Sequence, residues 1–156
     1  MTETCLRDGI YVSKDHPRIM LRGALDSLEA DILEAQILAV EKSEDYYVNA
    51  LAEILEFVRS LMSAEVNEKP AAAGKLFGFS LDELHEQSHR VKETFGFSHQ
   101  LPAHTMGALS IRLNTLRTRV RETELAAVRT PGADSIARAL NRLSSAVYWL
   151  FCRSVT

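Results

Sequence analysis

The sequence has few of the residues that crosslink a chain, and none of the segments that direct it to a membrane. Its two cysteines, Cys5 and Cys152, lie near opposite ends of 156 residues without a CxxC or paired spacing, so we expect free thiols in a reducing compartment. The N-terminal residues include no apolar stretch typical of a signal peptide, and no run of about 18 apolar residues occurs. We therefore expect a soluble, cytoplasmic protein without a membrane partner.

The sequence also lacks an excess of positive charge. Eighteen Lys and Arg against 21 Asp and Glu give a net charge of -3, which provides no reason to expect a nucleic-acid partner. No Gly-x-x-x-x-Gly-Lys-Ser/Thr or Gly-x-Gly-x-x-Gly motif is found, and no local motif suggests a Ser–His–Asp or Cys–His arrangement. A nucleotide, if one binds, must therefore bind to helix side chains and not to a glycine-rich loop.

The sequence does contain a series of amphipathic helical patterns, and 46% of its residues are apolar. We expect one domain over residues 1–156, with no convincing strand and helices over about 17–39, 44–66, 80–95, 105–129 and 134–153. Helices of this length with short links predict an all-α, five-helix up-and-down bundle.

Three signals set the expected helix boundaries. Asp15 and His16 are placed to cap the first helix, and Pro17 suits its first turn. Residues Ser80 to Glu83 have the pattern of a capping box, which predicts the start of the third helix. The pair Pro131-Gly132 separates the last two helices.

The fourth expected helix carries an unusual arrangement of charge. At about 100° per residue, Arg117, Arg121 and Glu124 fall on one narrow stripe, where the two guanidinium groups repel each other unless an anion lies between them. Arginine suits polyphosphate because its planar fork matches phosphate oxygens. The alternative is a solvated face with Arg121–Glu124 and Arg119–Glu122 pairs. The stripe borders the apolar face of the helix, which favours a polyphosphate site.

Two further polar residues could belong to this site. Asn141 lies on the fifth expected helix and can both donate and accept hydrogen bonds. Asp26 interrupts the apolar face of the first helix, where a carboxylate needs a cationic partner. It is either a solvated acid or the group that fixes an arginine in a ligand site, and the sequence leaves both readings open.

The histidines invite a metal hypothesis. His85 and His89 are four residues apart, and Glu86-x-x-His89 has the form of half a di-iron site, but no second such motif or nearby cysteine completes it, so we expect no metal site. His99 differs, because it lies in an apolar loop close to Phe95 and Phe97. It could face a flat aromatic ligand or close one end of the bundle.

Several segments together resemble a known family. They are SKDHPRIMLRGALDSLEA (13–30), LDELHEQSH (81–89), HQLP (99–102), LNTLRTRVRETELAA (113–127) and ALNRLSSAVYWL (139–150). In this order they resemble the ATP:corrinoid adenosyltransferases of the five-helix, propanediol-utilisation type, and most closely the ethanolamine-utilisation cobalamin adenosyltransferases.

The resemblance implies that cob(I)alamin attacks the 5′-carbon of ATP and displaces triphosphate, giving adenosylcobalamin. It implies that Arg121 contacts ATP and pairs with Asp26. The implied site consists of Arg121, Asp26 and Glu124 as catalytic residues, with Arg117, Asn141, Phe97 and His99 binding the substrates. It further implies Mg²⁺ with ATP, a homotrimer with sites between subunits, a reductase and a B12-dependent lyase as partners, and a link to a bacterial microcompartment.

The sequence departs from this family at several points. It has no glycine-rich Thr-Arg-x-Gly-Asp loop and no His…Cys-Cys-x-x-Cys motif, so it could be a shortened relative, or ATP could be held partly by another segment. Glu122 and Leu125 occupy positions where many relatives have arginines. His99 occupies the position of the family's phenylalanine, which helps to exclude the lower axial ligand of cobalt, and Phe97 or Phe95 could take this role. The alternatives are a non-catalytic corrinoid or nucleotide carrier or sensor, and a helical interaction module.

Overall fold

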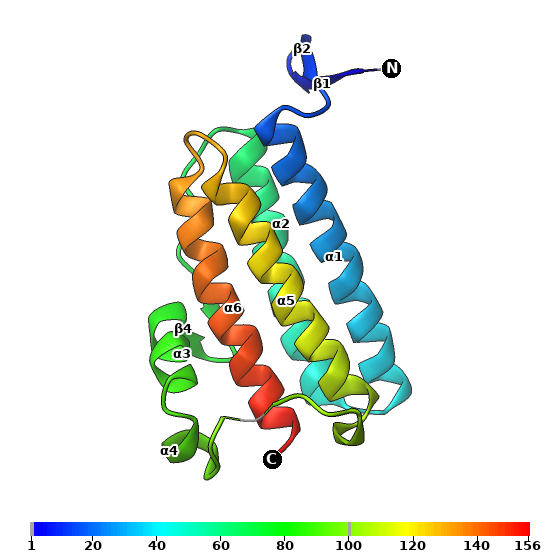
Figure 1. Ribbon diagram of the computed structural model, residues 1–156, viewed down its shortest axis with the longest axis vertical. Helices are drawn as coiled ribbons and strands as arrows, with labels where there is room; N and C mark the ends of the chain where they lie inside the picture. The colour runs from blue at the N-terminus through cyan, green and yellow to red at the C-terminus, as the bar shows by residue number, and fades with distance from the viewer. Residues whose placement is uncertain (1, 100) are drawn as a thin grey trace.

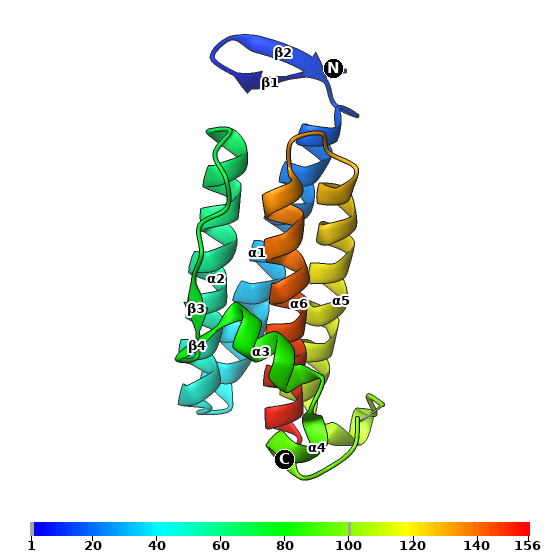
Figure 2. The same cartoon turned by 90° about the vertical axis from the view of Figure 1, so that its left-hand side faces the viewer.

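The computed structural model describes residues 2–99 and 101–156, and its main body is a bundle of four long helices (Figure 1). These are α1 (Pro17–Glu41), α2 (Asp45–Val66), α5 (Ala108–Val128) and α6 (Asp134–Ser154). Helix α5 lies between α1 and α6, and the segment between α2 and α5 returns along the outside of the bundle (Figure 2). With α3 (Leu81–Ser88) in this return segment, the predicted up-and-down order of a mostly helical protein is confirmed.

The core of the bundle follows from apolar residues three or four positions apart on each long helix. On α1 the buried positions are Leu21, Leu25, Leu28, Ile32, Ala35 and Ala39, which form one stripe. Corresponding stripes of α2, α5 and α6 meet it, and burial of each large aliphatic side chain contributes roughly 1.5–3 kcal/mol. None of the helices in the described parts of the chain combines the length and apolar character that crossing a bilayer requires.

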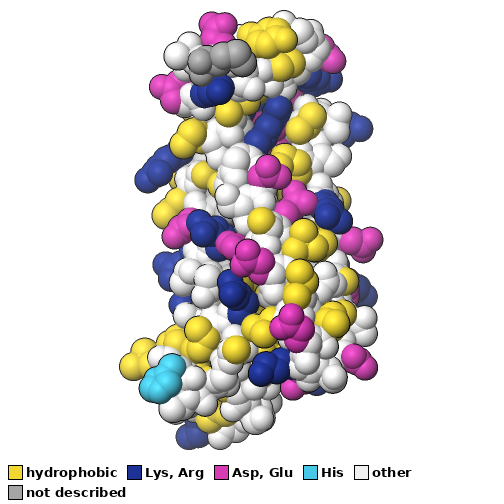
Figure 3. Space-filling view, turned by 90° about the vertical axis from the view of Figure 1, so that its right-hand side faces the viewer, with side chains coloured by type: hydrophobic (Ala, Val, Ile, Leu, Met, Phe, Trp, Pro, Cys, Tyr) yellow, Lys and Arg dark blue, Asp and Glu magenta, His cyan; other side chains and the backbone are white. Residues whose placement is uncertain are grey.

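The outward face of α1 is less polar than a solvated helix face usually is. Leu33, Ile37 and Val40 are 40%, 60% and 59% exposed, and Met20 lies nearer the start of the helix. Figure 3 shows this side of the molecule, where hydrophobic side chains lie among acidic and basic ones.

The local signals placed the helix boundaries well. His16 is the N-cap of α1, and its Nδ1 atom accepts a hydrogen bond from the backbone of Arg18, while Asp15 instead accepts one from Ser13. Both hydrogen bonds of the capping box between Ser80 and Glu83 are formed at the start of α3.

The expectation of no strand was wrong. Strands β1 (Glu3–Arg7) and β2 (Ile10–Ser13) form an antiparallel hairpin at one end of the bundle (Figure 2). Asp8 and Gly9 connect them with φ values of 46° and 80°, the left-handed conformation that a two-residue hairpin turn requires. A second, shorter hairpin consists of β3 (Lys75–Leu76) and β4 (Phe79–Ser80).

The third and fourth helices are shorter than expected. Helix α3 ends at Ser88, and a separate turn of helix, α4 (Val91–Phe95), follows and ends at Gly96 with a φ of 83°. A 3-10 turn, η1 (His104–Met106), precedes α5. Gly107 has a φ of 94°, which no α-helical residue adopts, so α5 begins at Ala108 and not near Thr105.

Candidate functional site

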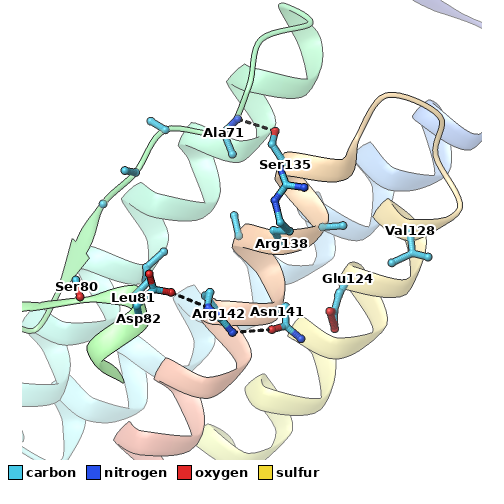
Figure 4. A pocket seen from close by; sticks show the side chains of 15 residues that line it. Ala71, Ser80, Leu81, Asp82, Glu124, Val128, Ser135, Arg138, Asn141 and Arg142 are labelled. Carbon is cyan, nitrogen blue, oxygen red and sulfur yellow. Dashed lines mark hydrogen bonds and ion pairs between the residues drawn. The ribbon is translucent and has the colours of Figure 1, made fainter. Parts of the chain in front are cut away.

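A groove runs along the outer face of α6, between α3 on one side and α5 on the other. It consists of two cavities that share Glu124 and Asn141 as lining residues. The upper cavity, of about 730 Å³, lies beside residues 71–74 and the first turns of α6 (Figure 4). The lower cavity, of about 340 Å³, lies toward the C-terminal end of α6 and includes Tyr148.

The floor of the groove is one stripe of α6. Ser135, Arg138, Asn141, Ser145 and Tyr148 line the groove at spacings of three or four residues, so they share one face of the helix. The opposite face carries buried Ile136, Leu140, Leu143 and Val147, which pack into the core. The amphipathic pattern of α6 therefore fixes which of its side chains a ligand in the groove can reach.

Helix α5 supplies the wall that the arginine stripe predicted. Arg117, Arg121 and Glu124 all line the lower cavity. The guanidinium of Arg117 donates two hydrogen bonds to Asn114 Oδ1, at 3.2 and 3.0 Å. Arg121 is exposed and, among residues 2–99 and 101–156, has no ion-pair partner. Its guanidinium is therefore available to an anion in the groove.

The alternative of a solvated, paired face holds only for the other flank of α5. There Arg119 bonds Asp31 of α1 at 2.7 Å and Glu122 at 3.1 Å. These bonds raise the pKa of Arg119, mainly through the hydrogen bond to Asp31. The predicted Arg121–Glu124 pair is absent among the described residues. The two flanks of α5 thus differ, and the one that faces the groove keeps its charges free.

Aromatic and imidazole rings line the lower end of the groove. His99 Nδ1 lies 2.6 Å from the Tyr148 hydroxyl, and the two rings stack with centroids 5.4 Å apart. His85 Nδ1 lies 2.9 Å from Ser145 Oγ, and its ring contacts that of His89. Burial lowers the pKa of His85, and the nearby charge of Arg142 lowers it further, so this ring is neutral at pH 7.

Two of the predicted site residues lie outside the groove. Asp26 is exposed on α1, lines neither cavity, and has no ion-pair partner within the described chain. Because α1 packs on the flank of α5 that carries Arg119, the implied Asp26–Arg121 pair is not formed within one chain. Phe97 stacks on Phe95 and packs against the core, so it does not join His99 in the groove. Gln100 of the HQLP motif lies outside the described residues.

Three charged residues of the upper cavity were not singled out from the sequence: Asp82, Arg138 and Arg142. Arg142 Nε donates a hydrogen bond to Asp82 Oδ1 of α3 at 2.9 Å, whereas Arg138 is exposed and has no ion pair in the part of the chain described (Figure 4). For Arg138 and Arg142 the available signal was their spacing from Asn141 on α6, whereas Asp82 lies on α3 and had no such signal. Along the whole groove, four arginines face two carboxylates, Asp82 and Glu124, so its charge is +2 in a chain of net charge -3.

The described residues contain no group of three or more His, Cys, Asp or Glu side chains arranged to hold a metal ion. His85 and His89, which share the i,i+4 spacing, are engaged in other contacts: His89 Nδ1 lies 2.8 Å from the backbone oxygen of His85. The side chains that distinguish the groove are therefore its arginines and its histidine and tyrosine rings.

Comparison with known proteins identifies the family of the chain. A family model described as cobalamin adenosyltransferase matches residues 1–154. The chain is 36% identical over 161 residues to the corrinoid adenosyltransferase EutT of Salmonella typhimurium strain LT2, covering 99% of this chain and 59% of that protein. It is 34% identical over 152 residues to EutT of Escherichia coli K12, covering 93% of this chain and 55% of the relative. The chain thus spans little more than half the length of these relatives, and it belongs to the cobalamin adenosyltransferase family.

Proposed function

We propose that this chain transfers the 5′-deoxyadenosyl group of ATP to cob(I)alamin and so forms adenosylcobalamin. The observation that carries the proposal is the unpaired Arg121, which lines a cationic groove together with Arg117 and Asn141 in a chain of net negative charge. An anionic ligand would satisfy these groups, and triphosphate is an anion that arginine binds well. Membership of the family supports the proposal.

The proposed reaction asks little covalent chemistry of the protein. The cobalt(I) centre donates an electron pair to the 5′-carbon, the carbon–oxygen bond breaks, and its electron pair leaves with triphosphate. Arg117 and Arg121 would stabilise the negative charge that grows on the leaving oxygen. Asn141, at the junction of the two cavities, would hold the nucleotide so that its 5′-carbon points toward the lower cavity.

The lower cavity suits the corrinoid. The stacked rings of His99 and Tyr148 present a flat surface against which one face of the macrocycle would lie. At the junction, Glu124 has no hydrogen-bond or ion-pair partner in the described chain, and a carboxylate is a ligand that Mg²⁺ accepts alongside phosphate oxygens. This supports Mg²⁺ as the ion that accompanies ATP.

We also propose that the chain works as a homotrimer with sites between subunits. Among residues 2–99 and 101–156, Arg121 has no carboxylate partner and Asp26 has no cationic one. Asp26 shares the outward stripe of α1 with exposed Leu33, Ile37 and Val40, at spacings of seven, four and three residues. A neighbouring subunit packed on this apolar stripe would cover it and bring Asp26 to Arg121.

The named relatives support a wider setting as well. EutT proteins belong by name to the corrinoid adenosyltransferases, and we propose the same role here in ethanolamine catabolism. A reductase would then supply cob(I)alamin and a B12-dependent lyase would use the product. The setting would be the bacterial cytoplasm, in association with a microcompartment.

A spectroscopic assay tests the proposal. The purified chain is mixed with ATP, Mg²⁺ and chemically reduced corrinoid, and formation of the cobalt–carbon bond is followed by absorbance. We expect turnover by the wild type and a loss of about 100-fold or more in Arg121→Ala, the usual cost of removing one group that stabilises the leaving charge. The matched control is Arg129→Ala, an exposed arginine at the end of α5 outside both cavities. Near-wild-type turnover by a folded Arg121→Ala variant would refute the role of this residue.

The second candidate is a non-catalytic corrinoid or nucleotide carrier. It is favoured by the N-terminal residues, which form a hairpin and contain no glycine-rich Thr-Arg-x-Gly-Asp loop; Arg22 of α1 donates a hydrogen bond to the backbone oxygen of Leu6 in this hairpin. Tight corrinoid binding without formation of the cobalt–carbon bond in the same assay would favour this candidate.

A further inference from the structure

We propose that Arg138 binds the terminal phosphates of the nucleotide in the upper cavity. This inference rests on the proposed function, because it requires that the groove hold a polyphosphate. Arg138 lies on the floor stripe of α6, one helical turn before Asn141 and Arg142. It lines the upper cavity with Glu124 and Asn141, and these two residues also line the lower cavity.

The two arginines of the upper cavity are in different electrostatic states. Arg142 is held by Asp82 at 2.9 Å, so its charge is already compensated. Arg138 is exposed and has no hydrogen-bond or ion-pair partner among the described residues; it lines the cavity, and its side chain extends along α6 toward Ser135 (Figure 4). An anion in this cavity would therefore gain more from Arg138 than from Arg142, because no carboxylate of the described residues forms an ion pair with Arg138.

The shape of the upper cavity leaves room for such an anion. Its outer wall consists of residues 71–74, which are three alanines and a glycine and so project little into the space. The backbone N–H of Ala71 is already bonded to Ser135 Oγ at 2.9 Å, which ties this wall to α6. The volume of about 730 Å³ is within the range of sites that bind small molecules.

The order of residues along the groove assigns Arg138 to the end of the phosphate chain. Arg121 lines the lower cavity, and Asn141 and Glu124 lie at the junction. Arg138 lines only the upper part of the groove and an adjoining cavity whose charged residues are of both signs: Arg18, Lys69, Glu65, Glu68 and Asp134. Phosphates that extend upward from Asn141 would meet Arg138 last. A contact this far from the reacting carbon is made equally in the ground and transition states, so it would lower KM without changing kcat.

Calorimetric titration of the full chain with inorganic tripolyphosphate tests the assignment without turnover. We expect Arg138→Ala to weaken tripolyphosphate binding about 10- to 100-fold, the value of one hydrogen bond to a charged group, and Arg138→Lys to retain part of it. The affinity for pyrophosphate, which is shorter, should fall less in Arg138→Ala than the affinity for tripolyphosphate. In the adenosyltransfer assay the KM for ATP should rise by a similar factor, with kcat and the KM for corrinoid unchanged.

The control is again Arg129→Ala, which removes an exposed arginine outside the groove. Equal tripolyphosphate affinity in Arg138→Ala and the wild type would overturn the assignment, as would absence of tripolyphosphate binding by the wild type. An equal loss in Arg129→Ala would also overturn it, because the effect would then reflect net charge. Tripolyphosphate binding that depends on Arg138 without any cobalt–carbon bond formation would instead refute the proposed reaction and leave Arg138 as an anion-binding residue.

Discussion

At the scale of single residues, Glu65 of α2 is the buried charged residue of the part of the chain that the structure describes. Its side chain is 3% exposed and binds two arginines of α1, with Arg18 Nε at 2.5 Å from one carboxylate oxygen and Arg22 Nε bonded to the other. Arg22 also donates to the backbone oxygen of Leu6 at 2.7 Å. Glu65 thus joins α1 to α2 and holds the arginine that contacts the N-terminal hairpin.

We expect Glu65→Ala to lower the free energy of unfolding by about 3 kcal/mol, because breaking the buried pair leaves Arg22 without a carboxylate and Arg18 with only the exposed Glu68. Urea denaturation followed by circular dichroism measures the change. Glu68→Ala is the control, since Glu68 also bonds Arg18, and Arg7 as well, but its side chain is 59% exposed. A surface pair of this kind contributes at most about 1 kcal/mol. Equal losses in the two variants would show that burial of Glu65 adds nothing.

The arginines of the groove show what spacing along one helix can predict. Arg117, Arg121 and Glu124 lie together because their spacing places them on one face of α5, and no knowledge of other helices is needed. Arg138 has an equally regular position on α6. It was missed because an exposed helix position becomes a groove position only when α3 and residues 71–74 cover its sides. No periodicity in the sequence links those segments to α6.

At the scale of elements, the stability of α3 depends on its N-terminal cap and on its contacts with α6. It has eight residues, which is shorter than a helix that is stable alone, and it packs mainly on α6. Trp149 of α6 donates a hydrogen bond to Gln87 at 2.8 Å, and Arg142 bonds Asp82. Helix α3 also carries His85 and His89, so its stability determines whether the lower cavity keeps its wall.

The capping box makes α3 testable separately from the bundle. Replacing Ser80 by Ala removes the oxygen that accepts the Glu83 N–H at 3.1 Å, and we expect a loss of about 1 kcal/mol. Hydrogen exchange should be faster at the amides of α3 while those of α6 stay protected. Ser80→Thr, which keeps the oxygen, should exchange like the wild type. Unchanged exchange of α3 in Ser80→Ala would mean that packing on α6 alone holds this helix.

The hairpin and the long helices differ in how strongly the sequence encodes them. The four long helices bury continuous apolar stripes, so their hydrophobic period predicted them within a few residues. Strands β1 and β2 are mostly exposed, with no buried face and thus no clear alternation of apolar and polar residues. The remaining signal in the sequence was the pair Asp8-Gly9, which is typical of a two-residue hairpin turn. This pair alone would have predicted the hairpin.

At the scale of the whole molecule, a single chain leaves two opposite charges unsatisfied on different sides. Arg121 faces the groove beside α6, and Asp26 lies on the outward face of α1, in the same stripe as the exposed Leu33, Ile37 and Val40. Within the described residues neither has a partner. Both facts have one physical explanation if a second copy covers the stripe of α1, because hydrophobic burial and charge pairing would then be satisfied at the same contact.

A mixing experiment tests whether one site uses two chains. We expect Asp26→Ala and Arg121→Ala to be inactive separately, since each removes one side of the same pair. Trimers reassembled from an equal mixture should regain about one quarter of wild-type turnover, because a random quarter of the contacts would join an intact Arg121 to an intact Asp26. If the pair instead formed within one chain, every chain in the mixture would lack one partner. The mixture would then stay inactive, and sedimentation of the mixed sample would show whether the two variants had assembled together.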